Sequence, residues 1–324
     1  MAKKDFSRVG LSLFLYAVVV IGIQLIAQVV LNVLYAQGMF DPNNTWITWG
    51  ATFLPNYLIG VPLAIGMMHR IEKDTYEPES MKLGQLIAFF VMTYPLMYIG
   101  NIIGTLLSYV FSGGQAVNQV ALLAEETSIV KIIVMVILAP VLEELVFRKT
   151  IIDRLGKYGE KTAILYSAIA FGLFHMNLYQ FFYAFAFGLI WGYIYVRTHK
   201  IQYTMCMHIL INFLGSVVAM KAVSKLDMDA LNQISSGFTD AQTIERFVST
   251  AGPFLIYFAF VMIMVVVGII LLLVNRKKFV FVEKENELPK EGKYKTMFIN
   301  VGSILFFIVC LVMFVLALLP AGTL

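Results

Sequence analysis

Long hydrophobic runs alternate with short polar and charged segments along the whole chain. A helix that crosses the hydrocarbon of a bilayer needs about 20 apolar residues, because each residue adds about 1.5 Å. The pattern predicts such helices near residues 9–35, 46–68, 85–111, 129–152, 162–177, 178–197, 201–221, 250–274 and 296–319. The expected fold class is therefore all-α, a polytopic transmembrane helix bundle with about eight or nine spans.

The composition excludes a water-soluble globule. Of the 324 residues, 60% are hydrophobic and only 14% are charged, and the mean hydropathy is +0.81. Soluble domains contain roughly 45–50% apolar and 25% charged residues. This number of charged side chains is too small to cover the surface of a soluble protein of this size. The solvent around most of the chain is therefore lipid.

The basic residues favour one side of the predicted membrane. Of the 24 lysines and arginines, all but Lys131, Lys221, Lys225 and Arg246 fall at the amino terminus or in the loops after even-numbered runs. Because cytoplasmic loops carry the excess of Lys and Arg, we expect the amino terminus in the cytoplasm. We expect an integral protein of the plasma (cell) membrane of a bacterium, surrounded by the lipid bilayer. No basic patch is interleaved with aromatic residues, which argues against a nucleic-acid partner.

Four ionisable residues lie where lipid should exclude charge. Of the 20 acidic residues, only Glu143 and Glu144 fall inside a predicted span, and His175 and His208 lie within or close to two others. A charge at the bilayer centre costs about 2.5–3.5 kcal/mol on insertion scales. These side chains must therefore face the bundle interior, where such residues usually mark a functional site.

Helix spacing predicts partners for these residues. Glu144 and Arg148 are four residues apart and can pair on one helix face, which leaves Glu143 about 100° around the helix. His208 and Asn212 are also four apart, so an imidazole and a carboxamide share a face. Elsewhere, glycines four apart at 100/104 and 188/192 predict close helix packing.

These residue types support two kinds of hydrolytic chemistry. A carboxylate and an imidazole around one water form a general base, and a second imidazole with a carboxamide can donate to a developing oxyanion. That set describes a hydrolase without a covalent nucleophile. Alternatively, Glu143, His175 and His208 could hold a zinc ion with an open position for water. The residues alone leave both possibilities open.

Three motifs follow one another in order within about 70 residues. The chain reads EExxxR over 143–148, FxxxH over 171–175 and HxxxN over 208–212. In this order, on successive hydrophobic segments, the motifs resemble the CPBP family of intramembrane proteases. This family comprises the type II CAAX prenyl endopeptidases and their bacterial relatives, also called the abortive-infection (Abi) family. The resemblance implies an all-helical membrane protease with an intramembrane cavity open to the cytoplasm.

The resemblance assigns catalytic roles to four residues by motif position. Glu143 and His175 would activate the attacking water, and His208 and Asn212 would stabilise the oxyanion. The substrate would be a membrane-associated peptide or protein, cleaved by an endopeptidase. Prenylated substrates would suit the eukaryotic branch, and nothing in this chain reads as a prenyl site.

Three further residues would support the site. Glu144 with Arg148 would maintain the geometry of the site. Phe171, one turn before His175, could line the same cavity. Mechanisms for the family have been argued both as glutamate-type and as metal-dependent. We favour the mechanism without a cofactor. The alternative is a zinc ion bound by Glu143, His175 and His208.

The resemblance also suggests a division of the chain. Residues 85–221 would form the CPBP-like catalytic core. Residues 1–84 would add amino-terminal spans and a cytoplasmic loop, and residues 222–324 would add carboxy-terminal spans. A charged segment over 276–295 is expected to be a solvated cytoplasmic linker before the last span.

Two functions of other classes compete with a protease. A transporter or proton-coupled channel could use the same buried Glu and His residues as a relay, but it predicts polar groups along a path through the bundle. The polar groups here cluster on three spans, and no inverted repeat is visible. A non-catalytic bacteriocin-immunity protein could keep the fold, although the intact motifs argue against it.

Overall fold

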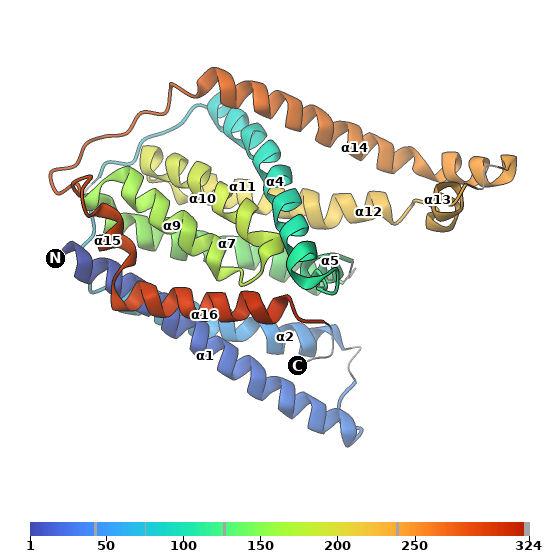
Figure 1. The fold of residues 1–324 in the computed structure, drawn as a ribbon, viewed down its shortest axis with the longest axis horizontal. Coiled ribbons are helices and arrows are strands. Elements are labelled where there is room, and N and C mark those ends of the chain that lie inside the picture. The colour runs from blue at the N-terminus through green and yellow to red at the C-terminus, as the bar shows by residue number, and fades with distance from the viewer. Residues whose placement is uncertain (42–43, 75, 126–127, 238–239, 321–324) are drawn as a thin grey trace.

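A computed structural model of the chain describes residues 1–41, 44–74, 76–125, 128–237 and 240–320, and these ranges contain helices but no strand (Figure 1). The all-α expectation is therefore confirmed. The helices before the motif region are α1 (Ala2–Ala36), α2 (Thr45–Pro55), η1 (Asn56–Gly60), α3 (Val61–Met68), α4 (Leu83–Ser112) and α5 (Gln119–Glu125). The motif region contains α6 (Ile129–Lys131), η2 (Ile132–Leu138), α7 (Ala139–Glu144), η3 (Leu145–Ile152), α8 (Asp153–Leu155), η4 (Gly156–Tyr158), α9 (Glu160–Phe174), α10 (Leu178–Thr198) and α11 (Ile201–Phe213). The remaining helices are η5 (Leu214–Val218), α12 (Ala219–Val223), α13 (Met228–Ser235), α14 (Ala241–Asn275), α15 (Lys293–Phe298) and α16 (Val301–Ala317).

Each predicted hydrophobic run coincides with helix, but the runs differ in how well they suit a bilayer. Within the described residues, five helical stretches are long and apolar enough to cross a membrane: Ala2–Ala36, Thr45–Met68, Leu83–Ser112, Ile201–Val223 and Ala241–Asn275. The other four runs, over 129–152, 162–177, 178–197 and 296–319, are helical but shorter or richer in polar and aromatic residues. The count of eight or nine spans therefore stays a prediction.

The last predicted run is broken. Helix α15 ends at Phe298 and α16 begins at Val301, because Asn300 caps the second helix. The side chain of Asn300 accepts a hydrogen bond from the backbone N–H of Ser303 at 2.9 Å. An asparagine in this position satisfies one of the free N–H groups at the start of a helix. The hydrophobic pattern alone could not show this break.

The helices form layers around the motif helices (Figure 1). Helices α1, α2 and α16 lie together along one side of the molecule, and α7, α9, α10 and α11 lie in the middle. Helix α4 packs against α10 and α14, and α10 packs against α9. Helix α14 lies along the edge opposite α1. The motif helices are thus enclosed by α1, α4 and α16.

Glycines allow several of these helices to touch. A Cβ atom at Gly100 would lie 2.6 Å from the backbone nitrogen of Tyr183, and one at Gly188 would lie 2.5 Å from the Cα atom of Ala168. Both predicted glycine pairs therefore sit at close helix contacts. The tightest contact joins the two ends of the chain, because a Cβ at Gly302 would overlap the carbonyl oxygen of Ser7.

One buried hydrophobic cluster extends through the molecule. It includes residues from Phe6 to Cys310, with Trp191 and Ile151 among those with no exposed surface. This cluster draws side chains from all three predicted parts of the chain, whose division at 84/85 and 221/222 stays a prediction. Large apolar side chains are exposed mainly along α14, the second half of α1 and α4. A helix that exposes apolar residues in this way is suited to lipid.

The charged segment over 276–292 is docked rather than simply solvated. It runs from α14 back to α15 at the end of the bundle that carries the amino terminus (Figure 1). Lys284 Nζ lies 2.7 Å from Asp74 Oδ2, and the backbone N–H of Val282 donates to Glu160 Oε2 at 2.9 Å. The N–H of Leu288 donates to the carbonyl of Tyr158 at 3.2 Å. We call residues 276–292 the strap.

Candidate active site

The first motif places its two glutamates in different surroundings. Helix α7 ends at Glu144, and η3 continues the same helix with the wider turns of a π-helix. The side chain of Glu144 has no exposed surface, whereas that of Glu143 is 29% exposed. Glu144 therefore points into the protein, and Glu143 faces open space.

The expected ion pair between Glu144 and Arg148 is present and fully buried. Arg148 Nε lies 3.2 Å from Glu144 Oε2, and neither side chain is exposed. The guanidinium lies 4.1 Å from the ring centre of Phe171 and 5.6 Å from that of Trp191. Its Nη1 and Nη2 atoms have no hydrogen-bond partner among the described residues. Aromatic faces thus enclose a charge that a single carboxylate balances.

His208 lies between the two glutamates. Its Nδ1 is 3.1 Å from Glu144 Oε1, and its Nε2 is 3.7 Å from Glu143 Oε2. The imidazole also packs against Trp191, with ring centres 4.8 Å apart. Because a carboxylate only accepts hydrogen bonds, the contact with Glu144 places a proton on Nδ1. The Nε2 atom then faces Glu143.

His175 occupies the end of α9, where the chain turns towards α10. Its Nδ1 lies 2.8 Å from the carbonyl oxygen of Phe171. A carbonyl oxygen only accepts, so Nδ1 carries the proton, and in the neutral ring Nε2 keeps a free lone pair. The ring of Phe171 contacts both histidines, with centre distances of 4.9 Å to His175 and 6.0 Å to His208.

The turn after His175 has a defined geometry. Met176 adopts a left-handed backbone conformation with φ of 56°. Asn177 caps α10 by accepting from the N–H of Gln180 at 2.9 Å, and its Nδ2 donates to the carbonyl of His175 at 2.7 Å. One side chain thus starts the next helix and holds the backbone of His175.

Asn212, from the third motif, lies one turn after His208 on α11. Its Nδ2 donates to the carbonyl of Met135 at 2.8 Å, which uses one of its two amide hydrogens. The amide group has a second hydrogen that can be donated to another partner.

The four predicted catalytic residues line one cavity of about 340 Å³. Phe171 lines the same cavity, whereas Glu144 and Arg148 lie outside its lining. Further polar groups come from α1, η1 and α10: Gln24, Asn56, Tyr57, Gln180 and Tyr183. The structure therefore brings residues of all three motifs to one cavity between helices. The opening of this space to the cytoplasm stays a prediction.

The predicted zinc ligands do not form a ligand set in this structure. Among the described residues, no three His, Cys, Asp or Glu side chains are close enough together to hold a metal ion. His208 uses Nδ1 for Glu144, and His175 uses Nδ1 for a backbone carbonyl. Because a metal-binding histidine usually donates its other ring N–H to such a group, the Nε2 atom of each ring is left as a possible ligand atom. The alternative zinc site on Glu143, His175 and His208 therefore stays a prediction.

Two residues that the structure places at this site were not predicted from the sequence. Trp191 contacts both His208 and Arg148, but a tryptophan in an apolar run looks like an ordinary core residue. Asn177 was detectable, because Asn177 and Gln180 have the spacing of a helix capping box. This capping-box spacing begins two residues after His175, which the motifs had already identified as a site residue.

Comparison with known proteins agrees with the motifs. Residues 125–214 match the family described as type II CAAX prenyl endopeptidase Rce1-like, a range that contains all three motifs. The chain is 27% identical over 201 residues to a Bacillus subtilis (strain 168) protein named "Putative membrane peptidase YdiL", and the match covers 58% of this chain and 80% of that relative. No solved structure matches the chain. Residues 125–214 are thus similar to a domain of the Rce1-like, or CPBP, family, which confirms the resemblance seen in the motifs.

Proposed function

We propose that this protein is an intramembrane endopeptidase that hydrolyses a peptide bond in a membrane-associated peptide or protein. The observation that carries the proposal is the single cavity lined by Glu143, His175, His208 and Asn212. Three helices far apart in the chain supply a carboxylate, two imidazoles and a carboxamide to one space. These are the groups needed to activate water and to stabilise an oxyanion.

In the proposed reaction, Glu143 and His175 activate a water molecule. The proton on His175 Nδ1 is held by the carbonyl of Phe171, so Nε2 is the atom able to accept a proton from water. Glu143 is the only glutamate of the adjacent pair that lines the cavity, so its carboxylate is the second acceptor. The water oxygen then attacks the carbonyl carbon of the scissile peptide bond. The C–N bond breaks as the proton taken from the water passes to the leaving amine nitrogen.

His208 and Asn212 are proposed to donate to the oxyanion that forms on the carbonyl oxygen. Asn212 has one amide hydrogen beyond the bond to Met135. His208 is oriented by Glu144 through Nδ1, and its Nε2 faces the side where Glu143 lies. Nε2 donates to the oxyanion only in the imidazolium form of the ring, in which both nitrogens carry a proton. Donors held in place before the reaction stabilise the transition state without reorganisation.

Glu144 and Arg148 are proposed to position the site without touching substrate. Glu144 is the carboxylate that orients His208, and Arg148 balances the charge of Glu144. Phe171 connects this pair to His175 through its ring and its carbonyl. This arrangement supports a general-base mechanism with a positioned imidazole.

The test uses purified full-length protein in detergent with a defined peptide library, whose cleavage is read by mass spectrometry. We expect Glu143→Gln and His175→Ala each to lower kcat/KM by about 10²–10⁴, the usual contribution of a general acid or base. We expect Asn212→Ala to lower kcat by about 10²–10³, as for removal of one oxyanion donor. Glu245→Gln and His69→Ala are matched controls, because both residues are exposed and lie outside the cavity.

Two results would overturn the assignment. Undiminished cleavage by both Glu143→Gln and His175→Ala would remove these residues from the chemistry. Loss of cleavage with a chelator, restored by zinc and accompanied by stoichiometric bound zinc, would replace the water-activation scheme with metal-assisted hydrolysis.

A further inference from the structure

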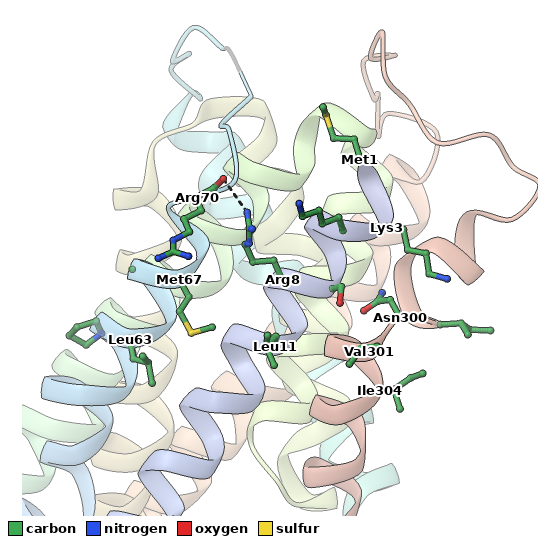
Figure 2. Close-up of a pocket in the computed structure, with 15 residues that line it drawn as sticks. Met1, Lys3, Arg8, Leu11, Leu63, Met67, Arg70, Asn300, Val301 and Ile304 are labelled. Carbon is green, nitrogen blue, oxygen red and sulfur yellow. Dashed lines mark hydrogen bonds between the residues drawn. The ribbon is translucent and has the colours of Figure 1, made fainter.

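A second and larger cavity, of about 1320 Å³, lies at the end of the bundle that carries the amino terminus. It is a groove over the first turns of α1, bordered by α3 on one side and by the start of α16 on the other (Figure 2). Its lining shares no residue with the lining of the candidate active site. The groove therefore needs an explanation of its own.

The charged side chains that line this groove are all basic. They are Lys3, Lys4, Arg8 and Arg70, and no acidic residue is among the lining residues. The nearest acid in the sequence, Asp5, is turned to the other side of α1. Its carboxylate accepts a hydrogen bond from Tyr158 Oη at 2.7 Å and lies 3.4 Å from Lys157 Nζ.

These four cations are unpaired within the described part of the chain, unlike others at the same end of the bundle. Lys157, Arg197 and Lys284 form ion pairs with Asp5, Glu160 and Asp74 respectively. None of the groove cations forms an ion pair with a described residue, although Arg8 Nη1 donates to the backbone carbonyl of Arg70 at 3.3 Å. The groove thus gathers four positive charges and no acidic residue in one lining.

The groove is also layered along the helix axes. The basic side chains of Lys3, Arg8 and Arg70 lie at one level, and Leu11, Leu63 and Ile304 lie below them, deeper along the bundle (Figure 2). Positions 4, 8 and 11 recur on one face of α1, which continues the groove from charge to apolar surface.

The basic layer lies at the ends of helices that are long and apolar enough to cross a membrane. Helix α1 and the stretch over 45–68 are both apolar enough to cross a bilayer, and Lys3, Lys4 and Arg70 flank the ends of these helices. Cations at helix ends reach the headgroup region, and the apolar residues beside them face the acyl chains.

We propose that this groove binds an anionic phospholipid. The headgroup phosphate would lie among Lys4, Arg8 and Arg70, and an acyl chain would follow Leu11 and Leu63 along the groove. The basic layer would bind a phosphate group, and both a phospholipid headgroup and free inorganic phosphate carry that group. The apolar layer is what favours a lipid, because inorganic phosphate has no group that would occupy it.

The first test separates charge from groove shape. Native mass spectrometry of the full-length protein in detergent would measure binding of short-chain phosphatidylglycerol, phosphatidylcholine of equal chain length, and inorganic phosphate. The variant Lys4→Gln/Arg70→Gln removes one Lys and one Arg from exposed positions. The control Lys290→Gln/Arg276→Gln removes the same two charges from exposed positions outside the groove.

We expect wild-type protein and the control to bind phosphatidylglycerol in preference to phosphatidylcholine. Each Lys or Arg beside an anionic lipid accounts for about a five-fold change in affinity, so the groove variant should bind about 30-fold more weakly. Equal affinity of the groove variant and the control would overturn the proposal. Inorganic phosphate binding as tightly as the lipid would overturn the assignment of the ligand as a lipid.

The second test blocks the apolar layer and leaves every charge in place. Gly66 lines the groove, and a Cβ atom there would meet nothing within 4 Å. Gly66→Trp should therefore fold and fill the groove, and we expect it to weaken phosphatidylglycerol binding at least as much as the charge variant does. Gly22→Trp is the matched control, because Gly22 is equally unobstructed and lies outside the groove. Unchanged lipid binding by Gly66→Trp would overturn the proposal.

Discussion

Adjacent residues of the first motif differ in what surrounds them. Glu144 is enclosed by Arg148 and His208, whereas Glu143 lines the cavity and is within 3.7 Å of His208. A helix turns about 100° per residue, so neighbours in sequence necessarily face different directions. One glutamate can therefore hold the site while the other takes part in the chemistry.

The buried pair predicts a large effect on stability. Arg148→Ala leaves the Glu144 carboxylate buried without its counter-charge, and breaking such a pair costs about 3–5 kcal/mol of unfolding free energy. The double variant Glu144→Gln/Arg148→Met removes both charges and should recover part of this loss. Thermal unfolding in detergent would measure both, with the exposed Arg276→Ala as control. A midpoint for Arg148→Ala equal to that of Arg276→Ala would contradict this account.

Asn177 offers a test of positioning near His175. Asn177→Ser keeps a side-chain oxygen that can cap α10, but it loses the Nδ2 donor to the carbonyl of His175. We expect little change in KM and a fall in kcat of about 10- to 100-fold, because small displacements of a catalytic group are costly.

The matched control for this variant is Asn300→Ser. Asn300 caps α16 in the same way and donates to nearby carbonyls, but it lies outside the active-site cavity. It should change thermal stability without changing kcat. If both variants lowered kcat equally, a local role for Asn177 would be ruled out.

Among the elements, the strap and the turn between α10 and α11 show how polar segments are held at the end of the bundle. The strap contacts α9 through Glu160 and the loop after α3 through Asp74. In the same region the ring of His199 stacks on that of Tyr76, with centres 3.5 Å apart. His199 has a left-handed backbone with φ of 48° and ends α10. These contacts replace water with protein around several polar groups.

This packing predicts a pH-dependent stability. Burial, and then the nearby Lys284 ammonium, lower the pKa of His199 from its usual 6.5 to about 4. In the unfolded chain, His199 therefore binds a proton as the pH falls through 6.5. In the folded protein it binds this proton only when the pH falls to about 4. This contribution to stability is complete above pH 6.5 and is lost as the pH falls towards 4.

The measurement is the thermal midpoint between pH 4 and pH 7.5 for wild type and for His199→Gln. The variant cannot gain this proton, so its midpoint should fall less across the interval. Asp153 lies in the same cluster, where burial raises the pKa of its carboxyl, an effect of opposite sign. Because Asp153 is present in both proteins, the difference between their curves reports His199. Parallel curves would contradict the prediction.

At the scale of the whole molecule, the distribution of charge predicts an orientation. Most basic residues lie at one end of the bundle, together with the amino terminus and the strap. The positive-inside rule then predicts that this end faces the cytoplasm. The segments that include Gln37 and Ser236 would face the other side of the membrane.

Cysteine labelling of intact cells would test this orientation. In a background without Cys206 and Cys310, we expect a membrane-impermeant maleimide to label Gln37→Cys and Ser236→Cys. We expect it to label Glu283→Cys only after lysis. All three positions are exposed, so failure to react would not reflect burial in the protein. Labelling of Glu283→Cys in intact cells would reverse the orientation.

Much of the site was predictable because its residues sit at helical spacings. The pairing of Glu144 with Arg148 and the shared placement of His208 with Asn212 follow from separations of four residues. The contact between Glu144 and His208 joins residues 64 apart in the chain, so no local pattern could predict it. Trp191 was missed for the same reason, since its role depends on which helix packs beside it.

The sequence by itself determined the helical class, the lipid surroundings and the three motifs, because hydrophobic periodicity and local spacing are properties of short segments. Only the tertiary structure decided which glutamate faces the cavity and how each histidine is oriented. It also decided that Arg8 and Arg70 meet at one groove beside Ile304. Such features depend on contacts between distant segments, and the packing of helices sets those contacts.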